Sequence, residues 1–164
     1  ILGRSAKRFL TRGLESRVGL SRGQETPAVL ETPAGRVGVV VCLDGFYSTA
    51  LDALDGLGAQ VVVQPSANFA PWARRWPPDE GYSEGEAWLS FGLRRGVRER
   101  QNVRYGVNPM LVGNLFGLRA EGRSSVVANP RFLAAETDGY GGVVALAASC
   151  DQEEILRTTI PLSL

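Results

Sequence analysis

The stretch from Val37 to Phe46 constrains the fold more than any other part of the sequence. Residues 37–41 are small or β-branched and carry no charge, which is typical of a buried strand. Cys42 follows directly, Leu43-Asp44-Gly45 has the composition of a turn, and residues 48–57 predict a helix. Such a strand, turn and helix place the turn residue at the rim of a sheet, near helix N–H groups. Two interpretations of Cys42 stay open at this point: a partly exposed, reactive thiol, or a buried structural cysteine.

The composition removes several kinds of chemistry. The chain has 164 residues and no histidine, which excludes Ser-His-Asp and Cys-His catalysis and histidine metal sites. If Cys42 is a nucleophile, its base is therefore a carboxylate or a lysine. A net charge of +1 gives no indication of nucleic acid or an anionic membrane as a partner, and no apolar run has the length of a membrane span. The two cysteines are too few for a disulfide framework and lack zinc spacing, so we expect reduced thiols and a cytoplasmic protein.

A second strand pattern, residues 60–64 with three consecutive valines, follows the predicted helix at 48–57, and Gly58 is typical of a helix C-cap. The order strand, helix, strand favours two neighbouring parallel strands. Ligands of such sheets bind beyond the carboxyl ends of the strands. Cys42 and residues 66–68 both follow such ends, so we expect them to be neighbours.

The rest of the chain alternates strand and helix patterns. Residues 83–101 predict one helix, because they begin with the spacing of a capping box and continue with apolar residues at every fourth position. An irregular loop with Trp72 and Trp76 precedes this helix. Further strands are expected at residues 1–6, 29–31, 36–41, 103–107, 124–127, 142–147 and 155–161. This pattern indicates an α+β or mixed α/β domain.

Lys7, at the end of the first expected strand, is the sole lysine of the chain. An ordinary surface lysine is the simplest interpretation of its sequence context. The chain opens with Ile1 rather than Met, and we expect it to be a piece of a longer protein.

Taken together, these motifs resemble the nitrilase, or carbon–nitrogen hydrolase, superfamily. Residues 3–10 look like the strand end that presents the family's catalytic lysine, here Lys7. Residues 31–44 are close to the family's nucleophile signature, with Cys42 as the nucleophile. Glu15 matches the family's second active-site glutamate loosely. The remaining landmarks are residues 58–68, 98–105, 122–124, Asn108 and Asn129-Pro130, so the match covers almost the whole chain.

The resemblance implies an αββα sandwich that needs a considerably longer chain. It therefore implies that residues 1–164 are the C-terminal part of a single carbon–nitrogen hydrolase domain, with the N-terminal part missing. The family's catalytic triad is Glu, Lys and Cys, and its glutamate lies upstream of the lysine, before this chain begins. The family needs no cofactor and no metal, and its members form homodimers or larger homo-oligomers through flanking helices.

The expected reaction starts from a thiolate, whereas a free thiol with a pKa of about 8.5 is mostly protonated at neutral pH. A nearby ammonium, here Lys7, lowers the pKa of such a thiol, and a carboxylate takes the proton. By resemblance, Cys42 attacks a small amide or nitrile, the oxyanion is held by Lys7 and the backbone N–H of Leu43, and water hydrolyses the thioester. Glu15 then positions substrate and water, and Asn68 binds substrate. The sequence Leu43-Asp44-Gly45 looks more like the amidase branches than the nitrilases.

Several roles have alternatives that the sequence leaves open. Glu15 has a second interpretation as an ordinary loop carboxylate, and turn formation explains Asn68 equally well. Asp44 is placed in a turn or N-cap role rather than as a base, and Cys150 as structural. Trp72 and Trp76 either line a substrate pocket or pack the loop. A nitrilase-like binding or scaffold protein without turnover is the alternative to an enzyme.

Overall fold

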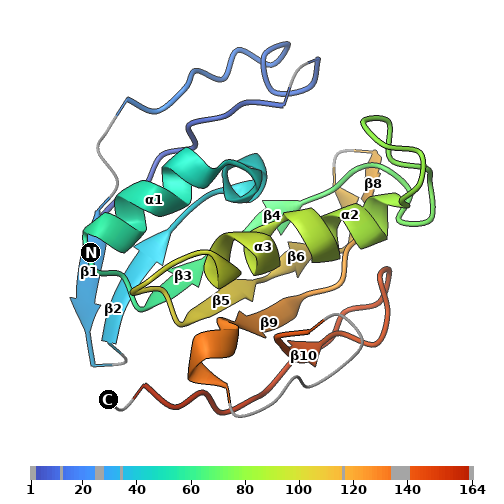
Figure 1. Cartoon of the computed structure of the whole chain (residues 1–164). Coiled ribbons are helices and arrows are strands. Elements are labelled where there is room, and N and C mark those ends of the chain that lie inside the picture. The colour runs from blue at the N-terminus through green and yellow to red at the C-terminus, as the bar shows by residue number, and fades with distance from the viewer. Residues whose placement is uncertain are drawn as a thin grey trace.

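The centre of the fold is one mixed β-sheet with helices on one face (Figure 1). The computed structural model describes residues 3–11, 13–24, 28–33, 35–115, 117–133 and 141–162. Within these residues the sheet has six strands in the order β1-β2-β3-β5-β9-β10. Their bounds are β1 (Val29–Thr32), β2 (Gly35–Val39), β3 (Val61–Val63), β5 (Tyr105–Asn108), β9 (Ser125–Ala128) and β10 (Val143–Leu146). This combination of a sheet with few helices confirms the predicted α+β class.

Two small two-stranded sheets extend the structure beyond the carboxyl ends of the central strands. β4 (Ser66–Ala67) pairs in parallel with β6 (Met110–Leu111), and β7 (Gly113–Leu115) pairs antiparallel with β8 (Leu118–Ala120). Because β4 follows β3 after a short link, it continues the path of the main sheet toward the region where ligands are expected.

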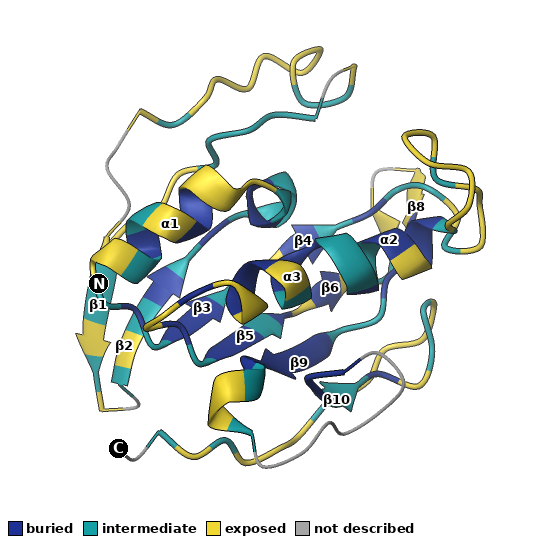
Figure 2. Ribbon diagram, in the orientation of Figure 1, coloured by how far each residue is buried: buried dark blue, intermediate teal, exposed yellow. Residues whose placement is uncertain are grey.

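The helices are α1 (Ser48–Gly56), α2 (Glu84–Phe91) and α3 (Leu93–Arg98), with short 3₁₀ segments η1 (Cys42–Phe46) and η2 (Pro130–Phe132). α1 and α3 lie on the same face of the sheet, with their buried residues toward it (Figure 2). The buried side chains of both helices form one cluster with those of the central strands. Leu51, Leu54, Val62 and Val97 form the centre of this core and are almost completely buried. The valine runs of the sequence therefore contribute to both faces of the sheet: Val40 and Val62 belong to this core, whereas Val37, Val61 and Val63 belong to a second cluster. Within the described residues, no helix has the length and apolarity to cross a bilayer.

The predicted strand–helix–strand unit is confirmed. β2 and β3 are parallel neighbours, with Val37 opposite Val61 and Val39 opposite Val63. α1 connects them, and Gly58, with φ of +77°, follows it in the left-handed conformation that favours glycine. The strands expected at residues 29–31 and 36–41 are present as β1 and β2, which pair antiparallel, and Ala34 between them lies outside the described residues.

The helix predicted over residues 83–101 is wrong as a single element, because it breaks at Gly92. The capping box at its start is present: Ser83 Oγ accepts from Glu86 N at 3.2 Å, and Glu86 Oε2 accepts from Ser83 N at 2.7 Å. Gly92 has ψ of −137°, which is not helical, so α2 ends and α3 begins at this residue. The break lets Leu93 bury its side chain in the sheet core, although the period of the sequence continues through it.

Two predicted strands are not formed. Residues 155–161 contain no strand; Ile155 is 80% exposed, whereas Ile160 packs against the sheet face that α1 and α3 leave uncovered. Residues 3–6 are also not in a strand, and Ile1 and Leu2 lie outside the described residues. Both segments are held by individual contacts instead of ladder pairing; Ser5 Oγ, for example, donates to Val39 O at 2.9 Å.

Candidate functional site

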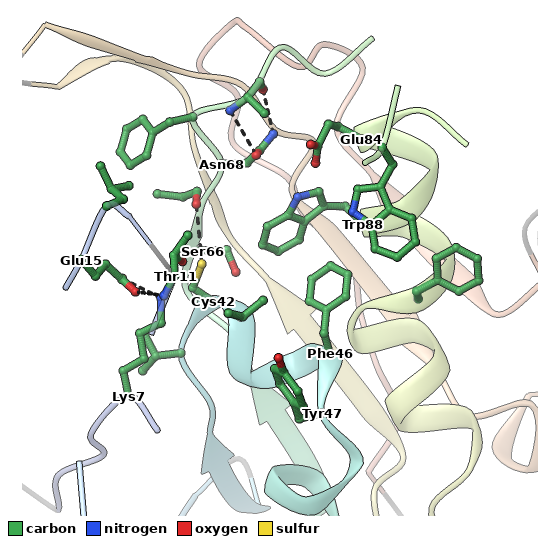
Figure 3. A pocket seen from close by; sticks show the side chains of 18 of the residues that line it. Lys7, Thr11, Glu15, Cys42, Phe46, Tyr47, Ser66, Asn68, Glu84 and Trp88 are labelled. Atoms are coloured by element: carbon green, nitrogen blue, oxygen red, sulfur yellow. Dashed lines mark hydrogen bonds and ion pairs between the residues drawn. The ribbon is translucent and has the colours of Figure 1, made fainter. Parts of the chain in front are cut away.

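A cavity of about 1060 Å³ opens where β2 and β3 end. It has a polar side, which holds Lys7, Glu15 and Cys42, and an aromatic side (Figure 3). The aromatic side is formed by Phe46, Trp76, Trp88 and Phe91. The cavity is also lined by Leu43 and by residues 66–68. The parallel strand order predicted that residues 66–68 would lie near Cys42, and they do.

Cys42 lies on a strained turn at the end of the β2 segment. Its φ of +52° falls in the left-handed region, and among the described residues it is the one non-glycine with positive φ. Such a conformation costs about 1–3 kcal/mol and persists only where surrounding contacts hold it. Here the backbone N–H of Cys42 donates to Pro65 O at 3.0 Å, and Sγ donates to Ala67 O at 3.6 Å. The turn thus presents the thiol to the cavity.

Gln64 fixes the peptide that follows the cysteine. Its side chain is fully buried, and its Nε2 donates to the Cys42 carbonyl at 2.6 Å. Because the peptide unit is planar and trans, a carbonyl held toward Gln64 directs the Leu43 N–H to the opposite side. No acceptor for that N–H is found within the described part of the chain. Gly45 makes the arrangement possible, since a Cβ there would lie 2.3 Å from Gln64 Nε2.

Lys7 and Glu15 form an ion pair at the cavity wall. Lys7 Nζ lies 2.6 Å from Glu15 Oε1, and their side chains are only 12% and 19% exposed. The surface-lysine interpretation of Lys7 is therefore wrong. The second oxygen of Glu15 accepts from Thr11 N at 2.6 Å. Burial alone would raise the pKa of Glu15, but the hydrogen bonds from Lys7 and Thr11 and the charge of Lys7 outweigh it and hold the pKa below its ordinary value.

Asp44 joins the Lys7 segment to the cysteine turn. Its carboxylate is buried and accepts from Phe9 N at 2.8 Å, Arg8 N at 3.1 Å and Val41 N at 3.2 Å. The contact with Val41 is the expected turn role, whereas the contacts with Arg8 and Phe9 are not visible in the sequence. Backbone N–H groups occupy both oxygens, so this geometry favours a structural carboxylate over a base.

The other predicted residues divide between the cavity and the scaffold. The Asn68 side chain is engaged in a turn, donating to Ala70 O at 2.9 Å and accepting from Ala70 N at 3.2 Å, while the residue lines the cavity. Trp76 lines the cavity. Trp72 instead packs on Gly85, so closely that a Cβ added to Gly85 would lie 2.3 Å from Trp72 Nε1. Cys150 is a free cysteine whose carbonyl accepts from Gly122 N. In the described residues no group of three or more histidine, cysteine, aspartate or glutamate side chains is arranged to hold a metal ion.

Sequence reasoning missed Gln64, Phe46 and Trp88. Gln64 ends the predicted strand, and a polar residue at that place is an ordinary strand terminus. Phe46 and Trp88 are aromatic residues of a turn and a helix, with no spacing that links them. Each of these residues is identified only by a contact between segments that are distant in the sequence: Gln64 with Cys42, and Phe46 of η1 with Trp88 of α2.

Comparison with solved structures shows which fold this is. An amidase from Nesterenkonia sp. AN1 matches with a TM-score of 0.65 and 18% identity, over 94% of this chain and 50% of that chain. A glutamate-to-glutamine variant of the same amidase, with the product of Michael addition of acrylamide at its active-site cysteine, matches with the same values. A cysteine-to-serine variant, described as an amidase from the nitrilase superfamily, matches with a TM-score of 0.58 and 18% identity, over 88% of this chain and 46% of that chain.

No protein-family model and no curated protein matches the sequence. The structural likeness nevertheless confirms the expected nitrilase-type fold. The chain spans about half the length of the solved structures that it matches. One helix layer on one sheet is accordingly the part of the αββα arrangement that these residues supply.

The cavity position of Cys42 predicts selective alkylation. Iodoacetamide reacts with the thiolate, and the Lys7 ammonium lines the same cavity as Cys42. We expect Cys42 to be modified far faster than Cys150 in the native protein, as measured by peptide mapping over time. A Lys7→Met variant, which lacks the ammonium, is the matched comparison. In this variant the modification rates of Cys42 and Cys150 should lie closer together. Equal rates for the two cysteines, or faster modification of Cys150, would contradict the site.

The lowered pKa of Glu15 predicts a pH-dependent contribution to stability. A carboxyl whose folded pKa lies below its unfolded value of 4.5 stabilises the fold above that pH and loses this effect as the pH falls through the lowered value. The difference in Tm between the native protein and Glu15→Gln should therefore be constant from neutral pH down to 4.5 and shrink in more acidic solution. Thermal melts across this range test it, with the exposed Glu153→Gln as control. A difference that grows on acidification would overturn the ion-pair account.

Proposed function

We propose that this chain is the C-terminal part of a carbon–nitrogen hydrolase that cleaves a small carboxamide through a cysteine thioester. The observation that carries the proposal is the meeting of Cys42, on a strained turn, with the Lys7–Glu15 pair at one cavity. The fold of the Nesterenkonia amidases supports the reaction class. A substrate nitrile is the less favoured choice, because the Leu43-Asp44-Gly45 sequence resembles the amidase branches.

In the proposed first step, the Cys42 thiolate attacks the carbonyl carbon of the amide. The carbon–oxygen π electrons move to the oxygen, which becomes an oxyanion. Lys7 Nζ and the Leu43 N–H stabilise it, and Gln64 holds the Leu43 peptide in the required direction. One preorganised donor of this kind is worth about 2.7–4 kcal/mol in the transition state.

The second half of the reaction releases the two products. The oxyanion collapses, the carbon–nitrogen bond breaks, and the nitrogen leaves as ammonia or an amine with the proton taken from the thiol. The thioester on Cys42 is then attacked by water, and the acid is released. By resemblance to the nitrilase superfamily, the group that moves these protons is a glutamate upstream of Lys7.

Glu15 has a positioning role in this proposal. Its carboxylate holds Lys7 Nζ at 2.6 Å and is itself held by Thr11 N, so the ammonium has a fixed place at the cavity wall. Asn68 is proposed to contact substrate through its backbone, because its side chain is engaged in the turn with Ala70. We further propose that the complete protein acts as a homodimer or larger homo-oligomer.

Two substitutions test the proposed roles of Lys7 and Cys42. Lys7→Arg keeps the charge but replaces a compact ammonium with a wide planar fork, and Cys42→Ser replaces the thiol with a hydroxyl whose proton is far harder to remove. Each variant should fold normally, and its rate of amide hydrolysis should be at least about a hundredfold lower than that of the unmodified protein. The measurement is ammonia release from aliphatic and aromatic amides by the full-length protein.

Cys150→Ser is the matched control and should leave hydrolysis unchanged. If the unmodified protein hydrolyses an amide and Lys7→Arg matches it, the proposed role of Lys7 is wrong. If the full-length protein has the upstream glutamate and hydrolyses neither amides nor nitriles, a binding or scaffold function without turnover replaces the proposal.

A further inference from the structure

We propose that the aromatic side of the cavity is a subsite for an uncharged aryl group, so that the substrate is an arylalkyl carboxamide. The subsite consists of Phe46, Trp76, Trp88 and Phe91. This inference rests on the proposed function for the identity of the reacting group. The recognition of the ring itself rests on the cavity alone.

The rings of the subsite hold one another in place. Phe46 and Trp88 meet edge to face, with centroids 4.9 Å apart and an interplanar angle of 86°. Trp76 stacks on Phe91 at 5.4 Å, and Tyr82 meets the edge of Phe91 at 4.8 Å. Aromatic pairs in these geometries are favourable beyond the apolar area that they bury. The subsite is therefore preorganised, which lowers the entropy cost of binding a flat apolar group.

The position of Phe46 places the subsite beside the thiol. Cys42 and Phe46 belong to the same 3₁₀ segment, η1, and Figure 3 shows Phe46 and Trp88 across the cavity from Lys7 and Glu15. An acyl group on Cys42 therefore has the ion pair on one side and the rings on the other. A short alkyl link between carbonyl and ring fits this arrangement.

Within the described residues, the cavity also has room for more than a simple aliphatic amide. Its volume of about 1060 Å³ is at the upper end of the roughly 300–1,000 Å³ that ligand pockets usually have. A two- or three-carbon amide bound at Cys42 would leave the rings in contact with water. A ring of the substrate would remove that apolar surface from water, which is the favourable process.

The charges near the rings are already paired, which argues for an uncharged group. Glu84 has a side chain only 8% exposed, and its carboxylate lies 2.6 Å from Arg74 Nη2. Arg95, the other charged residue on this side of the cavity, lies 3.3 Å from Glu99. A charged substituent would place an additional charge beside these pairs, whereas an unsubstituted ring adds none and leaves both pairs intact.

The kinetic test compares three amides in the full-length protein: propionamide, hexanamide and 3-phenylpropionamide. We expect kcat/KM for 3-phenylpropionamide to exceed that for propionamide by at least about tenfold, with hexanamide in between. Phe46→Ala and Trp88→Leu should remove most of this advantage, so that within each variant kcat/KM for 3-phenylpropionamide falls toward that for propionamide. Phe132→Ala is the control, because that ring packs on Arg104 away from this cavity. Equal kcat/KM for propionamide and 3-phenylpropionamide would overturn the inference while leaving amide hydrolysis established.

A binding test separates this inference from the proposed function. In Cys42→Ala, which has no nucleophile, 3-phenylpropionamide should change the tryptophan fluorescence in a saturable way, and propionamide should not. Adding Trp88→Leu should weaken the binding of 3-phenylpropionamide at least about tenfold. Saturable binding without turnover of any amide by the unmodified protein would support the subsite and refute the hydrolase proposal. Absence of binding, or equal binding of both amides, would refute the subsite.

Discussion

The buried carboxylate of Asp44 is the interaction on which the candidate site depends. It accepts backbone N–H groups from Arg8 and Phe9 on one segment and from Val41 on the other. Those segments carry Lys7 and Cys42, which are far apart in the sequence and belong to no common strand pair. A charged acceptor in a buried place makes strong hydrogen bonds, and leaving these N–H groups without it would be costly. Asp44 therefore keeps the ammonium and the thiol at one cavity without taking part in chemistry.

The sheet supplies the second requirement, which is the direction of the peptide after Cys42. The parallel pairing of β2 and β3 brings Pro65 O to the Cys42 N–H and Gln64 to the Cys42 carbonyl. These two contacts hold a residue with positive φ, whose strain would otherwise relax. The same contacts turn the Leu43 N–H away from Gln64. The contacts that hold the Cys42 turn therefore also set the direction of the Leu43 N–H, the candidate oxyanion donor.

The sequence predicted the parts of this site that follow from local patterns. Valine runs on either side of a helix predicted two parallel strands, and hence that Cys42 and Ser66 would be neighbours. The contacts of Asp44 with Arg8 and of Gln64 with Cys42 were not predictable, because each joins segments whose approach is decided by tertiary packing. The break at Gly92 was missed for a related reason: the apolar period continues through it, and the non-helical backbone of Gly92 leaves no mark on that period. The ring subsite depends on the placement of α2 and was equally invisible.

The central claim is that Cys42 forms a thioester with the acyl group of an amide, and trapping that intermediate tests it most directly. The full-length protein would be mixed with 3-phenylpropionamide or propionamide, quenched in acid during turnover, digested and analysed by mass spectrometry. The account predicts the mass of the acyl group on the peptide that contains Cys42, released by hydroxylamine and absent in Cys42→Ser. Amide hydrolysis with no acyl group on Cys42, or with the acyl group on Cys150, would contradict it.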